Sequence, residues 1–167
     1  MEDGLLPALD DALGGLLERE LGVPVRFDSP DKGWSGALPG IGLFLYDVRP
    51  APDAGARQWT TRAQDGTSAR VVPPRPLLAA YAVTAWAQDV RGEHALLSRV
   101  MTVVDAHPVL VDEGLRADVT LEAPPALGGP QKLVLGLRAR VLLEPGRRVP
   151  RGEAGAAPDI RVVPPDA

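Results

Sequence analysis

The first fifty residues carry a helical pattern of apolar positions followed by an extended one. Leucines recur at a spacing of three or four, which predicts an amphipathic helix over residues 3–21 that Gly22 and Pro24 end. The apolar run 41–48 has the length of a buried strand, and the alternation over 23–27 favours a further short one. The helical leucines are Leu6, Leu9, Leu13, Leu16 and Leu17.

Two adjacent glycines, Gly14 and Gly15, lie in the middle of the first predicted helix. Each lowers helix stability by roughly 1 kcal/mol relative to alanine. We therefore expect this helix to depend on docking, and we expect the glycines to permit a close approach of another segment.

The second half of the chain repeats the strand and helix patterns. Residues 77–87 read as a long strand, although their many alanines leave a helix as the alternative. Residues 92–106 carry one apolar stripe, which predicts a helix that ends before Pro108. Residues 119–121 and 132–143 predict two more strands. The small residues on one side of the 77–87 strand indicate that something packs closely there.

These patterns predict an α+β fold in a single domain over residues 1–144. It has a mixed or antiparallel sheet of about four to five strands, packed by two main helices and joined by long loops. The segment 49–72 reads as a long loop or a loosely formed hairpin. Residues 145–167 are rich in glycine and proline, which predicts a flexible tail. Within it, residues 160–163 have the composition of a short strand that can add to an exposed sheet edge of a neighbour.

Composition excludes several classes of protein. With 167 residues, 45% of them hydrophobic and 24% charged, the chain is suited to one globular core. No apolar run approaches the ~20 residues that span a bilayer, and the acidic start at Glu2 and Asp3 argues against a cleaved secretory signal. The absence of cysteine excludes disulfides and sulfur-ligated zinc. A net charge of -4 argues against a nucleic-acid partner.

The candidate chemical motifs are weak, and we predict no catalytic residue, metal site or cofactor. His94 and His107 lie at opposite ends of one predicted helix, roughly 20 Å apart, so they cannot share a metal within one chain. Ser35 lacks the spacing of a nucleophile elbow. The glycines at 36, 40 and 42 precede a strand and not a helix, which argues against a phosphate loop. The chain is therefore not expected to be an enzyme.

Six residues are candidate partner contacts. Trp34 and Trp59 fall in predicted loops, where an aromatic residue is often an anchor to a partner surface. Arg138 and Arg140 share the polar side of the last strand, where a solvated strand face is the competing interpretation. Ile160 and Val162 are the apolar positions of the predicted strand in the tail.

The order and spacing of three segments resemble a known family. They are the strand Phe44-Leu45-Tyr46-Asp47-Val48, the strand end Thr84-Ala85-Trp86, and the helix start Glu93-His94-Ala95-Leu96-Leu97. Together they resemble the tail-terminator (cap) proteins of extracellular contractile injection systems. These proteins are similar to the N-terminal domain of the virulence-cassette terminator family and are related to the tail terminators of contractile phages. The resemblance covers roughly residues 5–145.

The resemblance implies a structural protein of a bacterial phage-tail-like particle. It implies a homo-oligomer, in the form of a hexameric ring, that caps the distal end of the inner tube, stops its growth and anchors the last sheath ring. The tube and sheath proteins are then its partners, and its location is cytoplasmic as part of an assembled particle. The alternative is a small-ligand or peptide-binding adaptor domain without catalysis, which would use the loop 28–42 and the arginine strand.

Overall fold

The structure is a computed structural model that describes residues 4–29, 36–52, 60–64, 67–71, 74–124 and 132–143. Two long helices and a six-stranded sheet make up most of the described residues, and two further strands form a hairpin. In chain order the elements are α1 (Leu5–Leu21), β1 (Val25–Arg26), β2 (Gly40–Pro50), β3 (Thr60–Gln64), β4 (Thr67–Val71), β5 (Arg75–Trp86), α2 (Val90–Ala106), β6 (Val109–Asp112), β7 (Leu115–Glu122) and β8 (Val134–Leu143).

Helix α1 confirms the first predicted helix. Gly22 ends it in the left-handed conformation, with φ 69°, and donates its N–H to the Glu18 carbonyl. A Cβ placed on Gly14 would lie 2.8 Å from the Phe27 ring, so this glycine permits the close approach that was expected. A Cβ on Gly15 would meet nothing within 4 Å, so the expectation is wrong for that residue.

Helix α2 confirms the second predicted helix and begins at Val90, slightly earlier than predicted. Asp89 is its N-cap, and the Asp89 carboxylate accepts a hydrogen bond from the Gly92 N–H at 2.7 Å. His107 is the C-cap, as the following proline indicated.

The sheet has six strands in the order β1-β2-β5-β8-β7-β6, so the expected count of about four to five is too low. Strand β1 pairs parallel with β2, and every other neighbouring pair is antiparallel, which makes the sheet mixed. The predicted strands over 41–48, 77–87 and 132–143 correspond to β2, β5 and β8.

The missing strand is β6, and β7 is longer than predicted because it begins at Leu115 and not at residue 119. The two strands form a hairpin whose two-residue loop is Glu113 and Gly114. Both loop residues have positive φ, 37° and 88°, which is the backbone of a type I′ turn. Glutamate is an unusual residue at such a position.

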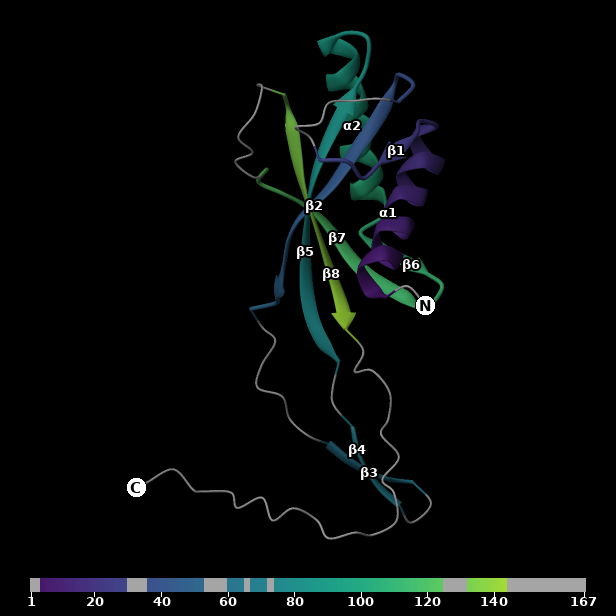
Figure 1. Ribbon diagram of the computed structural model, residues 1–167, viewed down its shortest axis with the longest axis vertical. Helices are drawn as coiled ribbons and strands as arrows, with labels where there is room; N and C mark the ends of the chain where they lie inside the picture. The colour runs from purple at the N-terminus through teal and green to yellow at the C-terminus, as the bar shows by residue number, and fades with distance from the viewer. Residues whose placement is uncertain are drawn as a thin grey trace, which may run out of the picture. The chain divides into compact units, whose positions relative to one another are not determined.

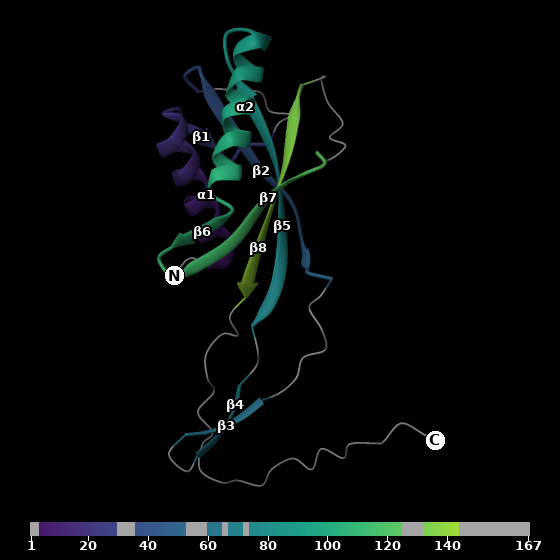
Figure 2. The same cartoon turned by 180° about the vertical axis from the view of Figure 1, so that it is seen from behind.

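The hydrophobic core lies between the two helices and one face of the sheet. In both views the helices lie on the same side of the strands (Figure 1 and Figure 2). Apolar residues at alternating positions of the central strands point into this core. The core residues of β5 are Ala79, Tyr81, Val83 and Ala85, and those of α2 are Leu96, Leu97, Val100 and Val104.

Helix α1 is joined to β5 by a partly buried polar contact. The Tyr81 hydroxyl, on a fully buried side chain, donates a hydrogen bond to Asp10 Oδ1 at 2.7 Å. Burial raises the pKa of Tyr81, and the bond to Asp10 raises it further. Burial also raises the pKa of Asp10, while the Tyr81 hydrogen bond lowers it and the charge of Asp11 raises it.

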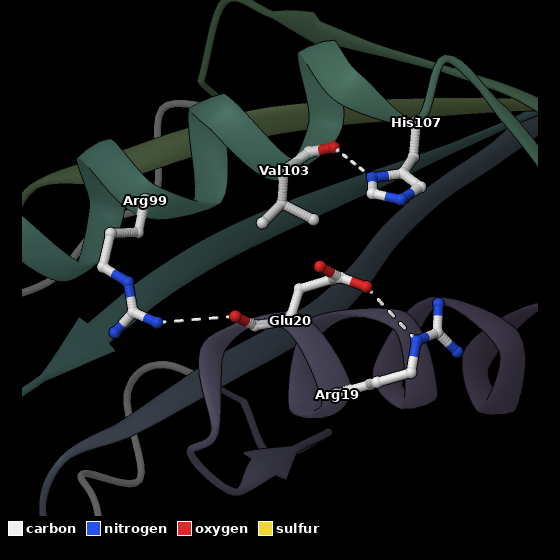
Figure 3. Close-up of polar contacts among 5 residues, drawn as sticks. All are labelled: Arg19, Glu20, Arg99, Val103 and His107. Carbon is white, nitrogen blue, oxygen red and sulfur yellow. Dashed lines mark hydrogen bonds and ion pairs between the residues drawn. The ribbon is translucent and has the colours of Figure 1, made fainter.

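A second polar contact joins the two helices (Figure 3). Arg99 of α2 donates from Nη2 to the Leu21 carbonyl at 2.9 Å and to the Glu20 carbonyl at 3.4 Å. These carbonyls lie at the C-terminal end of α1, where the helix dipole favours a cation. At the end of α2, His107 Nδ1 lies 3.0 Å from the Val103 carbonyl oxygen (Figure 3).

Strands β3 and β4 form an antiparallel hairpin. The hairpin belongs to a different compact unit of the chain than the six-stranded sheet and the helices. The hairpin alternative for the segment 49–72 is thereby confirmed. The division of the chain at residue 144 stays a prediction, because residues 144–167 lie outside the described residues. In the described part of the chain, no helix combines the length and apolarity that a membrane span requires.

Candidate interaction surface

The sheet face opposite α1 and α2, here called the helix-free face, is buried at its centre although neither helix covers it. Leu78, Ala80, Ala82 and Thr84 of β5 are between 0% and 8% exposed, yet they do not belong to the hydrophobic core cluster. The neighbouring residues on this face, by strand register, are Gly42, Phe44, Asp47, Arg49, Asp118, Thr120, Glu122, Val134, Gly136, Arg138 and Arg140.

A polar cluster formed by Tyr46, Glu122 and Arg138 crosses this face. The Tyr46 hydroxyl donates to Glu122 Oε1 at 3.2 Å, and the Arg138 guanidinium forms an ion pair with Glu122 Oε2. Strands β2 and β7, which carry Tyr46 and Glu122, are separated in the sheet by β5 and β8. In a flat sheet they would lie about 14 Å apart, so the sheet curls toward the helix-free face.

The backbone and the small residues of this face make room for the cluster. Tyr46 sits at a bulge, since Leu45 pairs with Tyr81 and Asp47 already pairs with Ala80. A Cβ on Gly136 would lie 2.5 Å from the Ala123 carbonyl oxygen and 2.7 Å from that of Glu122, so the end of β7 approaches β8 at this glycine. Among the described residues, Gly136 is thus a position on this face where two strands pack closely.

The cluster alters the electrostatics of the face. Burial raises the pKa of Tyr46, and the negative charge of Glu122 raises it further. The Glu122 side chain is 14% exposed and the Arg138 side chain 39%, so the ion pair is partly shielded from water.

The two candidate arginines have different surroundings. Arg138 is paired with Glu122 inside the chain, so its charge is already compensated. Arg140 is exposed and lies in register between Leu78 on β5 and Asp118 on β7. The pairing of Arg138 weakens the alternative in which this strand binds a ligand through its arginines.

Lys132 connects the start of β8 with the start of α2. Its Nζ lies 2.6 Å from Glu93 Oε1 and 3.8 Å from the centroid of the Trp86 ring. The Trp86 Nε1 donates in turn to Thr84 Oγ1 at 3.2 Å. Both charged side chains are about one-fifth exposed, which strengthens the ion pair and the cation–π contact relative to a surface pair.

A shallow depression of about 330 Å³ lies beside the start of α2. It is lined in part by Val23, Leu38, Pro39, Asp89 and Arg99, so the described end of the loop 28–42 contributes to it. Arg99 and Asp89 are both engaged in the helix-end contacts described above. The depression therefore offers mainly apolar contact.

The potential metal ligands of the described residues are dispersed. No group of three or more histidine, aspartate or glutamate side chains gathers there as a metal site would require. His94 lies in α2 and His107 caps its other end, as predicted. The glycines 40 and 42 belong to strand β2, which agrees with the argument against a phosphate loop.

The remaining four candidate contacts, Trp34, Trp59, Ile160 and Val162, lie outside the described residues. Two features of the surface were missed by sequence reasoning. The Tyr46 and Glu122 contact depends on the strand order, for which a single sequence gives no direct signal. The β6–β7 hairpin did have a signal, because Leu115, Ala117 and Val119 alternate with polar residues directly after Glu113 and Gly114.

Two solved structures have a similar fold. One is a sheath/tube terminator of an extracellular contractile injection system, PVC, in its extended state, with a TM-score of 0.69 and 16% identity over 98% of this chain. The other is the tube terminating cap of the anti-feeding prophage, with a TM-score of 0.64 and 19% identity over 96% of this chain. This chain spans 65% and 61% of the lengths of those two chains. Among curated proteins, none matches the sequence.

The family model gives the more specific result. The model described as the Pvc16 N-terminal domain matches residues 8–154, which include α1 except its first three residues, all of α2 and all six strands of the main sheet. The resemblance stated from the three sequence segments is thereby confirmed. The chain belongs to the Pvc16 N-terminal domain family.

Proposed function

We propose that this chain is a structural tail terminator, or cap, of a contractile injection system. It assembles as a homo-oligomeric ring, hexameric in our proposal, on the distal end of the inner tube. There it stops tube growth and anchors the last sheath ring, without catalysis and as part of a particle assembled in the cytoplasm. The observation that carries this proposal is the family match over residues 8–154, together with a fold similar to two terminators.

The two edges of the sheet support assembly into a ring. A closed ring of identical subunits needs two unlike surfaces, because each copy contacts its two neighbours through different faces. Strand β1 forms one edge as a two-residue parallel strand, and strand β6 forms the other as part of an antiparallel hairpin. The two edges therefore present unlike surfaces, which is compatible with a head-to-tail ring.

Deletion of the gene tests the proposal. We expect tubes and sheaths of uncontrolled length, or few complete particles, when length is measured by negative-stain electron microscopy. The wild-type chain should restore a narrow length distribution, and so should a His94→Ala chain, because His94 has no role in the proposal. Particles of normal length and normal yield in the deletion strain would contradict a terminator role.

A further inference from the structure

Among the described residues, strand β6 is an edge of the sheet whose outward backbone groups pair with no other strand. Val119 donates its N–H to the Pro108 carbonyl, which fixes the hydrogen-bonding phase of the β6–β7 ladder. Leu110 and Ala117 are then a hydrogen-bonded pair of this ladder. Val109 and Val111, which belong to non-hydrogen-bonded pairs, direct their N–H and C=O groups away from β7. No described strand lies beyond β6 in the sheet.

The side chains of the same two residues are also accessible. Val111 is 68% exposed and Val109 is 39% exposed, whereas Leu110 between them is buried in the core. The tight Glu113–Gly114 turn fixes the hairpin that carries this edge. The edge therefore combines a preformed row of backbone groups with two apolar side chains at alternate positions, which are the two elements of strand addition.

The opposite edge of the sheet is protected. The Val25 N–H of β1 donates to Glu18 Oε1 at 2.9 Å, so a side chain from α1 occupies a position where an added strand would bind. In addition, Arg26 forms an ion pair with Asp28 beside this strand. Of the two edges, β6 is the one that remains available for an extended segment.

We propose that the β6 edge binds the segment Ile160–Val163 of a neighbouring copy of this chain. This inference rests on the proposed ring, since it names a contact by which one copy holds the next. Ile160 and Val162 supply apolar side chains at alternate positions, which match the spacing of Val109 and Val111. The contact joins the segment of one copy to the β6 edge of the next copy. These are two different surfaces of the chain, as a head-to-tail contact requires.

The length and charge of the chain fit this contact. Residues 144–159 separate β8 from the segment and can span at most roughly 55 Å when fully extended, which is enough to reach an adjacent subunit. The hairpin carries Asp112, Glu113 and Asp118 against one basic residue, Arg116, so its net charge is negative. Residues 145–159 carry three arginines against Glu153 and Asp159, so their net charge is positive. This difference in sign favours the encounter of the two sides.

Disulfide trapping between differently labelled copies tests the contact, and the chain has no cysteine of its own to interfere. One batch carries Val111→Cys, and the other carries Ile160→Cys or Val162→Cys. After mixing at a concentration where the protein assembles, oxidation should give a mixed disulfide dimer on a non-reducing gel. The matched control is Arg161→Cys, which points to the other side of the added strand and should cross-link several-fold less.

The cross-linking yields decide whether the strand contact exists. A mixed dimer from residue 160 or 162 that exceeds the Arg161→Cys control several-fold supports the contact. Equal yields from all three positions, or no mixed dimer at all, would overturn it. Light scattering on the same samples reports ring formation separately. A ring without the cross-link refutes the strand contact and leaves the proposed function standing. The cross-link without a ring supports the strand contact and contradicts the proposed ring.

Discussion

The two faces of the main sheet are buried by different means. On one face, α1 and α2 supply leucines and valines that close a continuous apolar core. On the other face, the sheet curls on itself, and a tyrosine, a glutamate and an arginine form a polar cluster beside small residues of the central strands. The first face depends on hydrophobic burial, whereas the second depends on partly shielded polar contacts.

The two faces therefore contribute differently to the protein: one mainly to its stability, the other mainly to its accessible surface. Apolar burial accounts for most of the free energy that favours folding, so the helix-covered face should dominate stability. The helix-free face keeps charged groups such as Arg140 accessible while the curl holds its strands in place. A substitution should therefore have very different consequences on the two faces.

The largest expected effect comes from a charge in the helix-covered core. Leu97 is 2% exposed and Val100 is fully buried, so Leu97→Asp or Val100→Asp places a carboxylate without a partner between α2 and the sheet. The cost is comparable with the whole stability of a domain, about 5–15 kcal/mol, and we expect an unfolded protein by circular dichroism.

The matched control lies on the helix-free face. Leu142 is 49% exposed, and Leu142→Asp should change the free energy of unfolding by about 0.5 kcal/mol or less. Similar losses from both substitutions would show that the two faces do not differ as described.

A double-mutant cycle measures the polar cluster of the helix-free face. Tyr46→Phe and Glu122→Ala should each lower the free energy of unfolding by about 1 kcal/mol, because each removes a partly buried hydrogen bond. Since the two side chains contact each other, we expect a coupling of about 0.5–1 kcal/mol in chemical denaturation. Strict additivity of the two losses would mean that the contact across the sheet does not contribute to stability.

The pH dependence of stability distinguishes the partly buried Asp10–Tyr81 contact. The pKa of Asp10 is raised in the folded state, so its protonation favours folding below the ordinary carboxyl pKa, and this contribution is lost as pH rises through the raised pKa. Asp10→Asn should remove that dependence and keep an oxygen acceptor for Tyr81. If denaturation curves of Asp10→Asn and wild type keep the same pH profile across the acid range, the assigned shift is wrong.

Small effects are also expected at the histidines. His94→Ala and His107→Ala should each change the free energy of unfolding by about 1 kcal/mol or less, with His107 the larger because its ring contacts the Val103 carbonyl at the end of α2. A chelator should leave the melting temperature unchanged. A melting temperature that falls with chelator would indicate a metal-dependent fold and would refute the account of these residues.

Sequence patterns were sufficient wherever a segment was long and buried on one side. The leucine spacing of α1, the stripe of α2 and the alternation of β5 and β8 each extend over ten residues or more. Strand β6 was missed because it has four residues, of which Leu110 alone is buried, so it carries almost no periodic signal. The role of Gly136 could not be predicted from the sequence either, because it depends on the backbone of β7 lying beside this glycine.

The candidate surface was less predictable than the fold. Arg138 was identified as a partner contact because it shares a strand face with Arg140, but its ion pair with Glu122 depends on β7 and β8 being neighbours. Tyr46 was part of the family resemblance, whereas its contact across the sheet depends on a bulge and on the curl. Such contacts arise from strand order and sheet shape, which local patterns do not encode.

Electron microscopy of purified particles tests the central claim most directly. Particles that carry a tagged copy of this chain would be labelled through the tag and averaged at both ends. We predict an additional ring, and the label, at the end of the tube away from the baseplate. Label at the baseplate, label along the sheath, or labelled protein that never sediments with particles would contradict the role as a terminator.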